Sequence, residues 1–395
     1  MTQFAGFGGV GGVGGVGGVG GVGGVGGVGG VGGVGGVGGV GGSLADGFAN
    51  GLTVSSLITG REATLDPSDA DSYAGIGEPP RGPAAMERWE PWVRNTVGLQ
   101  ALLEACRVER DEAGVVSLWH RGQDKPVVSL QAPALASFRR QLKLVLSWAE
   151  LRDERSAEIL AQIDNQFAML ASVAYLHPQR TRRSYELLNL ALQFAVSVEM
   201  RIKHELACWR PLEFSPQVQP LLTTPGHGSL PSGHATQAFM AAEVLAALLG
   251  LAGQDGHPLV VQLQRQAARI ATNRVVAGVH FPVDSMAGRV LGKALAEYFL
   301  ARVVGDGGNR RIASRAFLGA AFDKTPDSDF RPFEQALDGD PKLAPFYGCA
   351  AAAVEVEPES GGLLNTFWTA ARSEWAGRSY GPAPAAPAPR KKVKK

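Results

Sequence analysis

Three short segments between residues 203 and 284 carry side chains that could act on an anion. The first, KHELACWRP, holds Lys203 and Arg210, two cations seven residues apart. Seven residues are close to two helical turns, so the spacing predicts that both cations project from one side of a helix, which Pro211 then ends. By itself, a pair of cations on one face is more typical of a solvated surface than of a binding site.

The second segment, PSGH, runs directly into an apolar stretch with helical spacing. Ser232 is well placed as the N-cap, Gly233 lets the backbone approach a ligand closely, and His234 falls in the first turn. A helix start presents free N–H groups and partial positive charge, which suits an anion. A capped helix with a chance histidine explains the tetrapeptide equally well.

The third segment, NRVVAGVHFPVD, places Arg274 near a predicted helix end and His280 in the connection to the next helix. Asp284 falls near the third position of that helix, from which a carboxylate can reach back to the imidazole. A carboxylate on one ring nitrogen leaves the other as a lone-pair donor, which a nucleophile or a metal ligand requires. Alone, His280 is more typical of a structural loop histidine.

Taken together, the segments supply three fixed cations, a hydroxyl and an amide at a helix start, and two histidines. Forked guanidinium groups with an ammonium group suit a tetrahedral oxoanion of high charge, such as phosphate or vanadate. The chemistry predicted from the residues alone is therefore the binding of an oxoanion next to a group that can carry a proton.

Lys-x6-Arg-Pro, Pro-Ser-Gly-His and Arg-x5-His-x3-Asp occur here in this order. The set resembles the three-part motif of the type 2 phosphatidic acid phosphatase and vanadium haloperoxidase superfamily, over roughly residues 200–290. One position departs from it: Asn273 stands where phosphatases of the family commonly have serine. The resemblance implies a helical bundle and an enzyme.

The resemblance also implies a role for each matching position. His280 would bond the central atom, which is vanadium in a haloperoxidase and the transferred phosphorus in a phosphatase. His234 would be the acid–base residue, and Asp284 would orient His280. The oxygens of the oxoanion would be bound by five positions: Lys203, Arg210, Ser232, Gly233 and Arg274.

His227 lies seven residues before His234, at a position that overlooks the vanadate in the haloperoxidase branch. Chloroperoxidase-like members tend to have an aromatic residue there and bromoperoxidase-like members a histidine, whereas Trp209, before the arginine, resembles the chloroperoxidase form. We expect His227 to tune the site toward bromide and iodide over chloride. The alternative is a loop histidine in water.

Three functions remain open. The favoured one is a vanadium haloperoxidase that takes vanadate, with no haem and no nucleotide, and acts on hydrogen peroxide, a halide and an organic acceptor. The second is a soluble acid phosphatase that hydrolyses phosphate monoesters through a phosphohistidine intermediate. The third is a non-catalytic helical protein that binds an oxoanion. Lipid phosphatases of the superfamily span membranes, and this sequence has no apolar run long enough to do so.

Composition limits which kinds of partner and which cellular compartment can be expected. Lys and Arg number 38 against 37 Asp and Glu, so overall charge does not indicate a nucleic-acid partner. Three scattered cysteines, Cys106, Cys208 and Cys349, do not form a disulfide framework or a zinc site. Neither a signal peptide nor a membrane span is visible, so the compartment is expected to be the cytoplasm or is left open. The oligomeric state also stays open, a homo-oligomer included.

The elements that must position these residues are predicted to be helical, in an all-α bundle. We expect a disordered Gly-Gly-Val repeat, an irregular region with one helix and a hairpin, the helical core, an extension packed on it and a disordered Pro/Ala and basic tail. Their bounds are 1–43, 44–135, 136–305, 306–380 and 381–395.

Individual elements follow from the periodicity of apolar residues. A helix is expected at 96–113, a hairpin within 115–130, and helical spacing from residue 136 that His177-Pro178 ends. The later helices are expected in four places: before Pro211, and at about 233–250, 258–277 and 282–302. A short helix is expected near LLNTFWTAARSEWAG.

Overall fold

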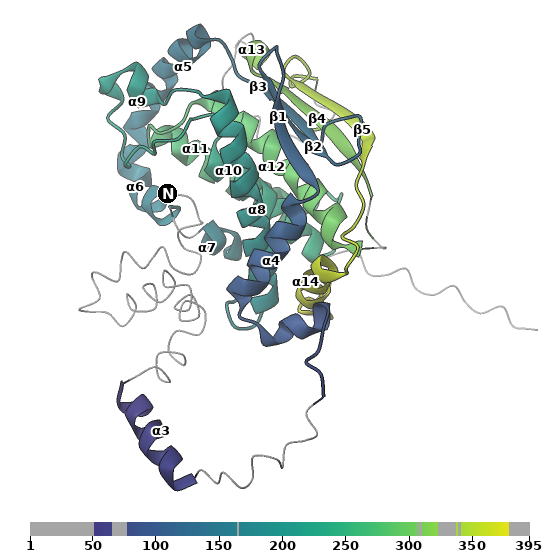
Figure 1. The fold of residues 1–395 in the computed structure, drawn as a ribbon. Helices are drawn as coiled ribbons and strands as arrows, with labels where there is room; N and C mark the ends of the chain where they lie inside the picture. Colours follow the sequence, from purple (N-terminus) through teal and green to yellow (C-terminus); the bar gives the residue numbers. More distant parts are fainter. Residues whose placement is uncertain are drawn as a thin grey trace, which may run out of the picture.

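The molecule is mixed α/β, and the prediction of an all-α bundle is wrong. In the described part of the chain, a body of helices packs on a five-stranded sheet (Figure 1). The two expected disordered tails lie outside that part. The computed structural model describes residues 51–64, 77–163, 166–305, 308, 310–322, 337–338 and 341–378.

The sheet joins two regions that are distant in sequence. Its strands follow one another in chain order, antiparallel except for the parallel pairing of β3 with β4. The predicted hairpin is confirmed as β2 and β3. The strands are β1 (Cys106–Arg110), β2 (Val115–His120), β3 (Val128–Gln131), β4 (Arg311–Leu318) and β5 (Tyr347–Glu355).

Tertiary pairing explains why most of the sheet escaped prediction. The helix expected at 96–113 is α4 (Pro91–Leu103) only, and the rest of that stretch is β1. In β1, Val108 lies opposite Leu118 of β2. Residues whose apolar spacing favours a continued helix are therefore held in a strand by pairing with the edge of the hairpin. β5 has the sequence YGCAAAAVE, and alanine favours helices, yet β4 pairs with it.

The long helical stretch predicted from residue 136 is interrupted in the structure. The stretch from residue 136 is divided into three helices, and the region expected to be irregular contains α3. These elements are α3 (Gly51–Thr64), α5 (Leu135–Trp148), α6 (Arg152–Ala161), α7 (Gln166–Ala171) and α8 (Arg182–Leu206). Short 3-10 segments cover Pro83–Arg88, Ala149–Leu151 and Pro216–Val218.

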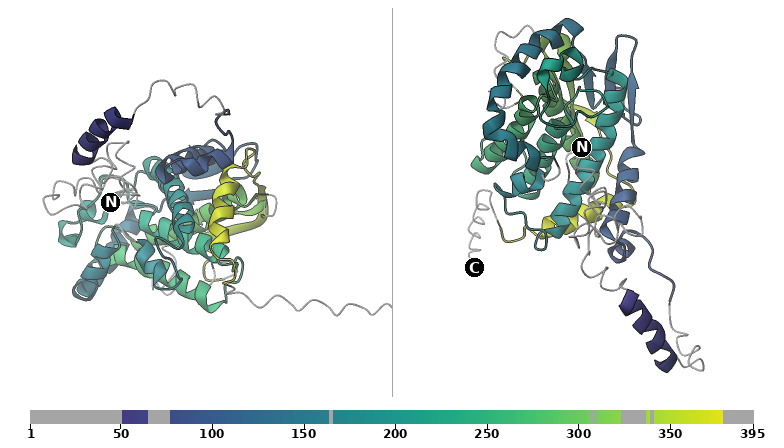
Figure 2. Two further views of the ribbon diagram at one scale, coloured as in Figure 1. Left: turned by 90° about the horizontal axis from the view of Figure 1, so that it is seen from below. Right: turned by 90° about the vertical axis from the view of Figure 1, so that its left-hand side faces the viewer.

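The predicted later helices are confirmed as α10 (Gly233–Leu248), α11 (Pro258–Val276), α12 (Pro282–Val303) and α14 (Leu363–Ser373). The two single-turn helices are α9 (Pro211–Phe214) and α13 (Gly319–Phe322). The residues of α10 are apolar and buried on nearly every side of the helix, as expected for a helix at the centre of the body. α8, α11 and α12 pack around it. α8 and α12 also contact strands of the sheet, which runs along one side of the body (Figure 2).

Two glycines let α12 come unusually close to α10. A Cβ on Gly288 would lie 2.7 Å from the carbonyl oxygen of Ser232, and one on Gly292 would lie 2.5 Å from that of Thr236. Any larger residue at either position would therefore push the helices apart. The close approach brings the first turns of α10 and α12, which carry two of the three motif segments, side by side.

Candidate active site

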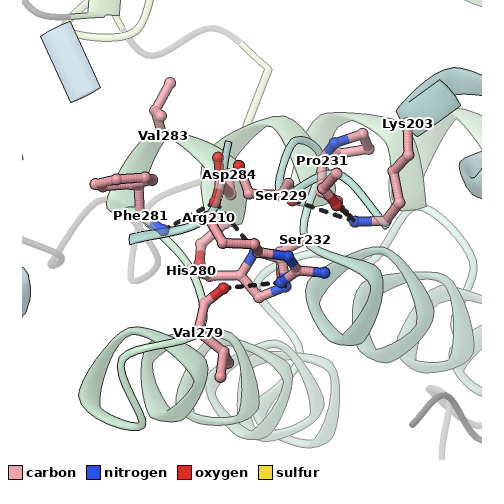
Figure 3. A network of polar contacts seen from close by, with 12 residues as sticks. Lys203, Arg210, Ser229, Pro231, Ser232, Val279, His280, Phe281, Val283 and Asp284 are labelled. Carbon is pink, nitrogen blue, oxygen red and sulfur yellow. Dashed lines mark hydrogen bonds and ion pairs between the residues drawn. The ribbon is translucent and has the colours of Figure 1, made fainter. Parts of the chain in front are cut away.

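The candidate site lies where the first turns of α10 and α12 meet. The amide of Ser232, the residue before α10, donates to the carbonyl of Asp284 in the first turn of α12 at 2.8 Å. The segment after α8 and the end of α11 complete the surroundings, so all three motif segments converge, as Figure 3 shows (Figure 3). Every position predicted for the site is buried except His227, which is half-buried.

His280 is held by a carboxylate in the way the spacing predicts. Its Nδ1 lies 3.0 Å from Oδ2 of Asp284, and the same oxygen accepts from the amide of Phe281 at 2.8 Å. Burial, with the charge of Arg210, holds the pKa of His280 well below its usual value, so the ring is neutral. With Nδ1–H donating to Asp284, Nε2 carries the lone pair.

Arg210 reaches this nitrogen by a route that differs from the prediction. α8 ends at Leu206 because Ala207 adopts a left-handed conformation (φ 48°), so Arg210 is not on the same helix as Lys203. Instead it precedes α9, which Pro211 begins. Its Nη1 lies 3.0 Å from Nε2 of His280 and donates to the carbonyl of Val279 at 2.8 Å.

The ammonium of Lys203 is surrounded by backbone oxygens. It donates to the carbonyls of Gly228 (3.1 Å), Ser229 (3.2 Å) and Pro231. These contacts fill its three donors and hold the loop that leads to Ser232. Burial and the charge of Arg210 lower the pKa of Lys203. In this arrangement Lys203 holds the loop before α10 and has no free donor for the predicted oxoanion.

The start of α10 is different, because its polar groups have no protein partner. Ser232 is the N-cap by position, but its hydroxyl makes no capping bond and has no partner, although the side chain is fully buried. Nε2 of His234 is also buried without a partner. Burial, followed by the charge of Arg274, lowers the pKa of His234 well below its usual value, so this imidazole is neutral.

Of the residues predicted to bind the oxoanion, Arg274 has the largest number of buried donor atoms without a hydrogen-bond partner. Its Nη2 donates to the carbonyl of Ile159 (3.0 Å) and to Oε1 of Gln162 (2.9 Å), while Nε and Nη1 have no partner. Burial lowers its pKa to about 10. Unpartnered buried donors are costly, about 1–3 kcal/mol each and more when charged, so these two donors are the ones that an acceptor at this position would stabilise most.

His227 lies against Arg210. Its Nδ1 is 3.0 Å from Nη2 of Arg210, and its carbonyl accepts from Nε of the same guanidinium at 3.0 Å. Burial and the charges of Lys203 and Arg210 lower the pKa of His227 to about 4, so it is a neutral acceptor. The structure therefore connects His227 with the motif residues, and it is not a loop histidine standing free in water.

Two buried residues at the site escaped the sequence analysis. Gln162, at the end of α6, accepts from Arg274 and from Nδ2 of Asn273 (3.0 Å), and its backbone bonds to His234. Glu199, on α8, contacts the start of α10. A signal existed only for Glu199, which is one helical turn before Lys203; nothing in the sequence near Gln162 indicates a role.

A tetrahedral oxoanion fits this set of groups. The unpartnered groups that could face its oxygens are one hydroxyl, two guanidinium nitrogens and one imidazole nitrogen, on Ser232, Arg274 and His234. Oδ1 of Asp284, a fourth predicted position, is also buried without a partner. A bare metal cation does not fit, since no cluster of three or more His, Cys, Asp or Glu side chains suited to one occurs in the described part of the chain. An oxoanion bonded to a single histidine needs no such cluster.

The stretch of chain that carries the candidate site matches a known family. Residues 185–305 match the model of the PAP2 superfamily, so the chain contains a PAP2 superfamily domain there, in agreement with the resemblance. Members of this superfamily are mostly phosphatases or haloperoxidases. A search of curated proteins found no match. Among the described helices, none is both long and apolar enough to cross a membrane.

Proposed function

We propose that the PAP2 superfamily domain of this chain works as a vanadate-dependent haloperoxidase, which uses hydrogen peroxide to oxidise a halide ion to a halogenating species. The observation that carries the proposal is the group of buried polar atoms without partners on Ser232, His234 and Arg274. They offer three donors and one imidazole nitrogen to an oxoanion of the shape that vanadate and phosphate share.

The residues divide into those that hold the oxoanion and those that serve the reaction. Vanadate, when bound, supplies a Lewis-acidic centre that makes peroxide more reactive toward a halide. His280 would bond its metal through Nε2, and its oxygens would be held by Arg274, the hydroxyl of Ser232 and the amide of Gly233. Arg210 and Lys203 add positive charge, which further favours the anion.

His234 and Asp284 handle the protons and the orientation. Because His234 is neutral in the free site, its Nε2 would take a proton from the incoming peroxide and return it to the departing oxygen. Asp284 holds the ring of His280 by accepting from Nδ1, which keeps the lone pair on Nε2. His280 must exchange its contact with Arg210 for the incoming group.

The halide is proposed to be bromide or iodide rather than chloride. This rests on His227, a neutral imidazole bonded to Arg210 at the position where bromoperoxidase-like relatives carry histidine. Such an imidazole adds a polar group beside the oxoanion and changes how firmly Arg210 is held. Trp209, the feature that favours chloride, has a side chain that is 58% exposed.

The alternative is a phosphatase that hydrolyses phosphate monoesters. It is favoured by the same neutral, carboxylate-oriented His280, which is also what a nucleophile needs. Nε2 of His280 would bond the phosphorus as the ester oxygen leaves, and this oxygen would receive the proton of the monoanionic phosphate ester by way of Nε2 of His234. Water would then attack the phosphohistidine and give its proton to His234, which would pass it to the departing inorganic phosphate and return to its neutral form.

One experiment separates the candidates. The purified protein is assayed with and without added vanadate, for bromination of a phenol by peroxide and bromide, and for hydrolysis of p-nitrophenyl phosphate. Our proposal expects bromination that depends on vanadate and disappears in His280→Ala. Vanadate that only inhibits hydrolysis would establish the phosphatase. Binding of vanadate without either activity would leave a non-catalytic oxoanion-binding protein.

A further inference from the structure

A buried carboxyl group lies directly beneath the proposed oxoanion site. Glu199 on α8 is fully buried. A site that binds an anion through cations does not by itself require a carboxyl group next to it. Its Oε1 accepts from Nε2 of Gln237 at 3.1 Å, and its Oε2 is buried without a partner. An unpaired carboxylate oxygen inside a protein is unfavourable unless the group can change its charge.

The contact with the site runs through Gly233. A Cβ on this glycine would lie 2.6 Å from Oε1 of Glu199, so the carboxyl group presses against the backbone whose amide faces the proposed oxoanion. Only a residue without a side chain leaves room for it. Glu199 is therefore separated from a bound oxoanion by little more than the thickness of the chain at the start of α10.

Among the residues that the structure describes, no cation forms an ion pair with this carboxyl group. Lys203 lies one turn further along α8, but its ammonium bonds to three backbone carbonyls. Arg210, in the segment after α8, is the second charge that acts on Glu199. The neighbouring elements present uncharged amides: Gln237 on α10 and, behind it, Gln166 on α7 at 3.5 Å.

We propose that Glu199 takes up a proton when an oxoanion binds, so that the site exchanges a negative charge of its own for that of the ligand. The proton comes from solvent and ends on the carboxylate as a carboxylic acid. This proposal rests on the oxoanion site of the proposed function. It adds a residue that sets the charge and the pH dependence of binding without touching the ligand.

The physical reason is mutual repulsion. Burial raises the pKa of Glu199 to about 7, against the lowering effects of Lys203, Gln237 and Arg210, so the group stands between its two charge states near neutral pH. An oxoanion bound across the backbone of Gly233 raises this pKa further, because two negative charges repel strongly in a poorly solvated interior. Binding and protonation therefore favour each other.

The direction of the pH dependence follows. Where Glu199 is already protonated in the free protein, below about pH 7, binding needs no proton. Above that value each binding event must take one up, so affinity falls by at most about tenfold per pH unit. Glutamine has the shape of the protonated acid, so Glu199→Gln should bind the oxoanion at high pH as the wild type does at low pH.

The test measures proton uptake directly. Sulfate is used as the probe because it stays a dianion across the range, and the full chain is titrated calorimetrically at about pH 7.5 in two buffers with different heats of ionisation. The wild type should take up more protons per sulfate than Glu199→Gln, by about half a proton at this pH. Glu243→Gln is the control, since Glu243 also lies on a central helix but bonds Gln264 and Lys293.

The outcomes separate this inference from the function. Equal proton uptake by wild type and Glu199→Gln, with both binding sulfate, would overturn the role of Glu199 and leave the oxoanion site intact. Failure of the wild type to bind either sulfate or vanadate would overturn both. Should Glu199→Gln not fold, Glu199→Asp decides: uptake retained with a shifted pH midpoint supports the proposal, and an unchanged pH profile of affinity contradicts it.

Discussion

Arg315 and Arg274 are both almost fully buried, at 2% and 1% exposed, but their surroundings are opposite. Arg315 on β4 donates to Glu297 (2.6 Å), to Asp338 (2.5 Å) and to the hydroxyl of Tyr347. Burial disfavours its charge, but the two carboxylates more than offset this and hold its pKa above the usual value.

Arg274 has no carboxylate partner at all among the described residues. Its neighbours are a backbone carbonyl and the amide of Gln162, and the only acid that raises its pKa is Glu158, through space. The net result is a pKa lowered to about 10. The same fold thus compensates one buried guanidinium with carboxylates and leaves the other without one, which is the difference expected between a structural cluster and the proposed oxoanion site.

The largest expected effect is on the reaction rate, through the proposed acid–base residue. His234→Ala should lower the rate of bromination, or of ester hydrolysis, by about two to four orders of magnitude, the range for loss of an acid–base group. Oxoanion affinity should change little, since Arg274 holds the charge. His204→Ala, on the exposed side of α8, is the control. Near-full activity of His234→Ala would contradict the assignment.

The second prediction tests the two arginines against each other. Arg274→Met should lower the affinity for vanadate or sulfate by about a hundredfold, because two charge-assisted hydrogen bonds are lost. Arg274→Lys should restore little of it, since an ammonium cannot reproduce the fork.

Arg315→Met should instead lower the free energy of unfolding by about 2–3 kcal/mol, less than for a wholly enclosed pair because Asp338 is partly exposed. Its oxoanion affinity should equal that of the wild type. Calorimetric affinity and chemical unfolding measured on both variants give the result. Similar losses of affinity in the two would remove the distinction between them.

The third prediction concerns a variant that gives Arg274 a carboxylate partner like those of Arg315. Gln162→Glu places a carboxylate on Nη2 of Arg274, in the manner of Arg315. We expect oxoanion affinity to fall by about tenfold or more, since the new charge repels the ligand, while the unfolding midpoint rises. Gln162→Leu, which removes the bond without adding charge, should weaken binding only a few-fold. Unchanged affinity in Gln162→Glu would show that Arg274 does not face the ligand.

The smallest effect concerns selectivity rather than rate. The wild type should brominate faster than it chlorinates, and His227→Phe should change that ratio several-fold, because the bond to Arg210 is removed. Because the pKa of His227 is lowered to about 4, this ratio should not vary between about pH 6 and pH 8 through His227. Equal rates with the two halides, or an unchanged ratio in the variant, would contradict the tuning role.

The local geometry of the candidate site was largely readable from the sequence. Asp284 reaches His280 because both lie at one helix start, and Gly278, with φ of 78°, ends the stretch that carries Arg274. Such relations span a few residues and depend on helix geometry alone. The placement of Arg210 was predicted for the wrong reason, since a continuous helix was expected where Ala207 ends it.

What the sequence could not provide was every relation between distant segments. Gln162 reaches Arg274 across 112 positions, and β3 pairs with β4 across a longer interval. A polar side chain such as Gln162 gives no hint of which surface it will be buried against. The alanines of β5 give the wrong hint, because the neighbouring strand decides their conformation.

The parallel pairing of β3 with β4 affects how the chain can be made. Every motif residue lies between these two strands, so a ribosome synthesises the whole candidate site before Arg315 emerges to pair with Val128. Until then the hairpin presents an open edge, which favours association with other chains. A chain that ends just after Val303 would contain every residue of the candidate site but only three of the five strands of the sheet.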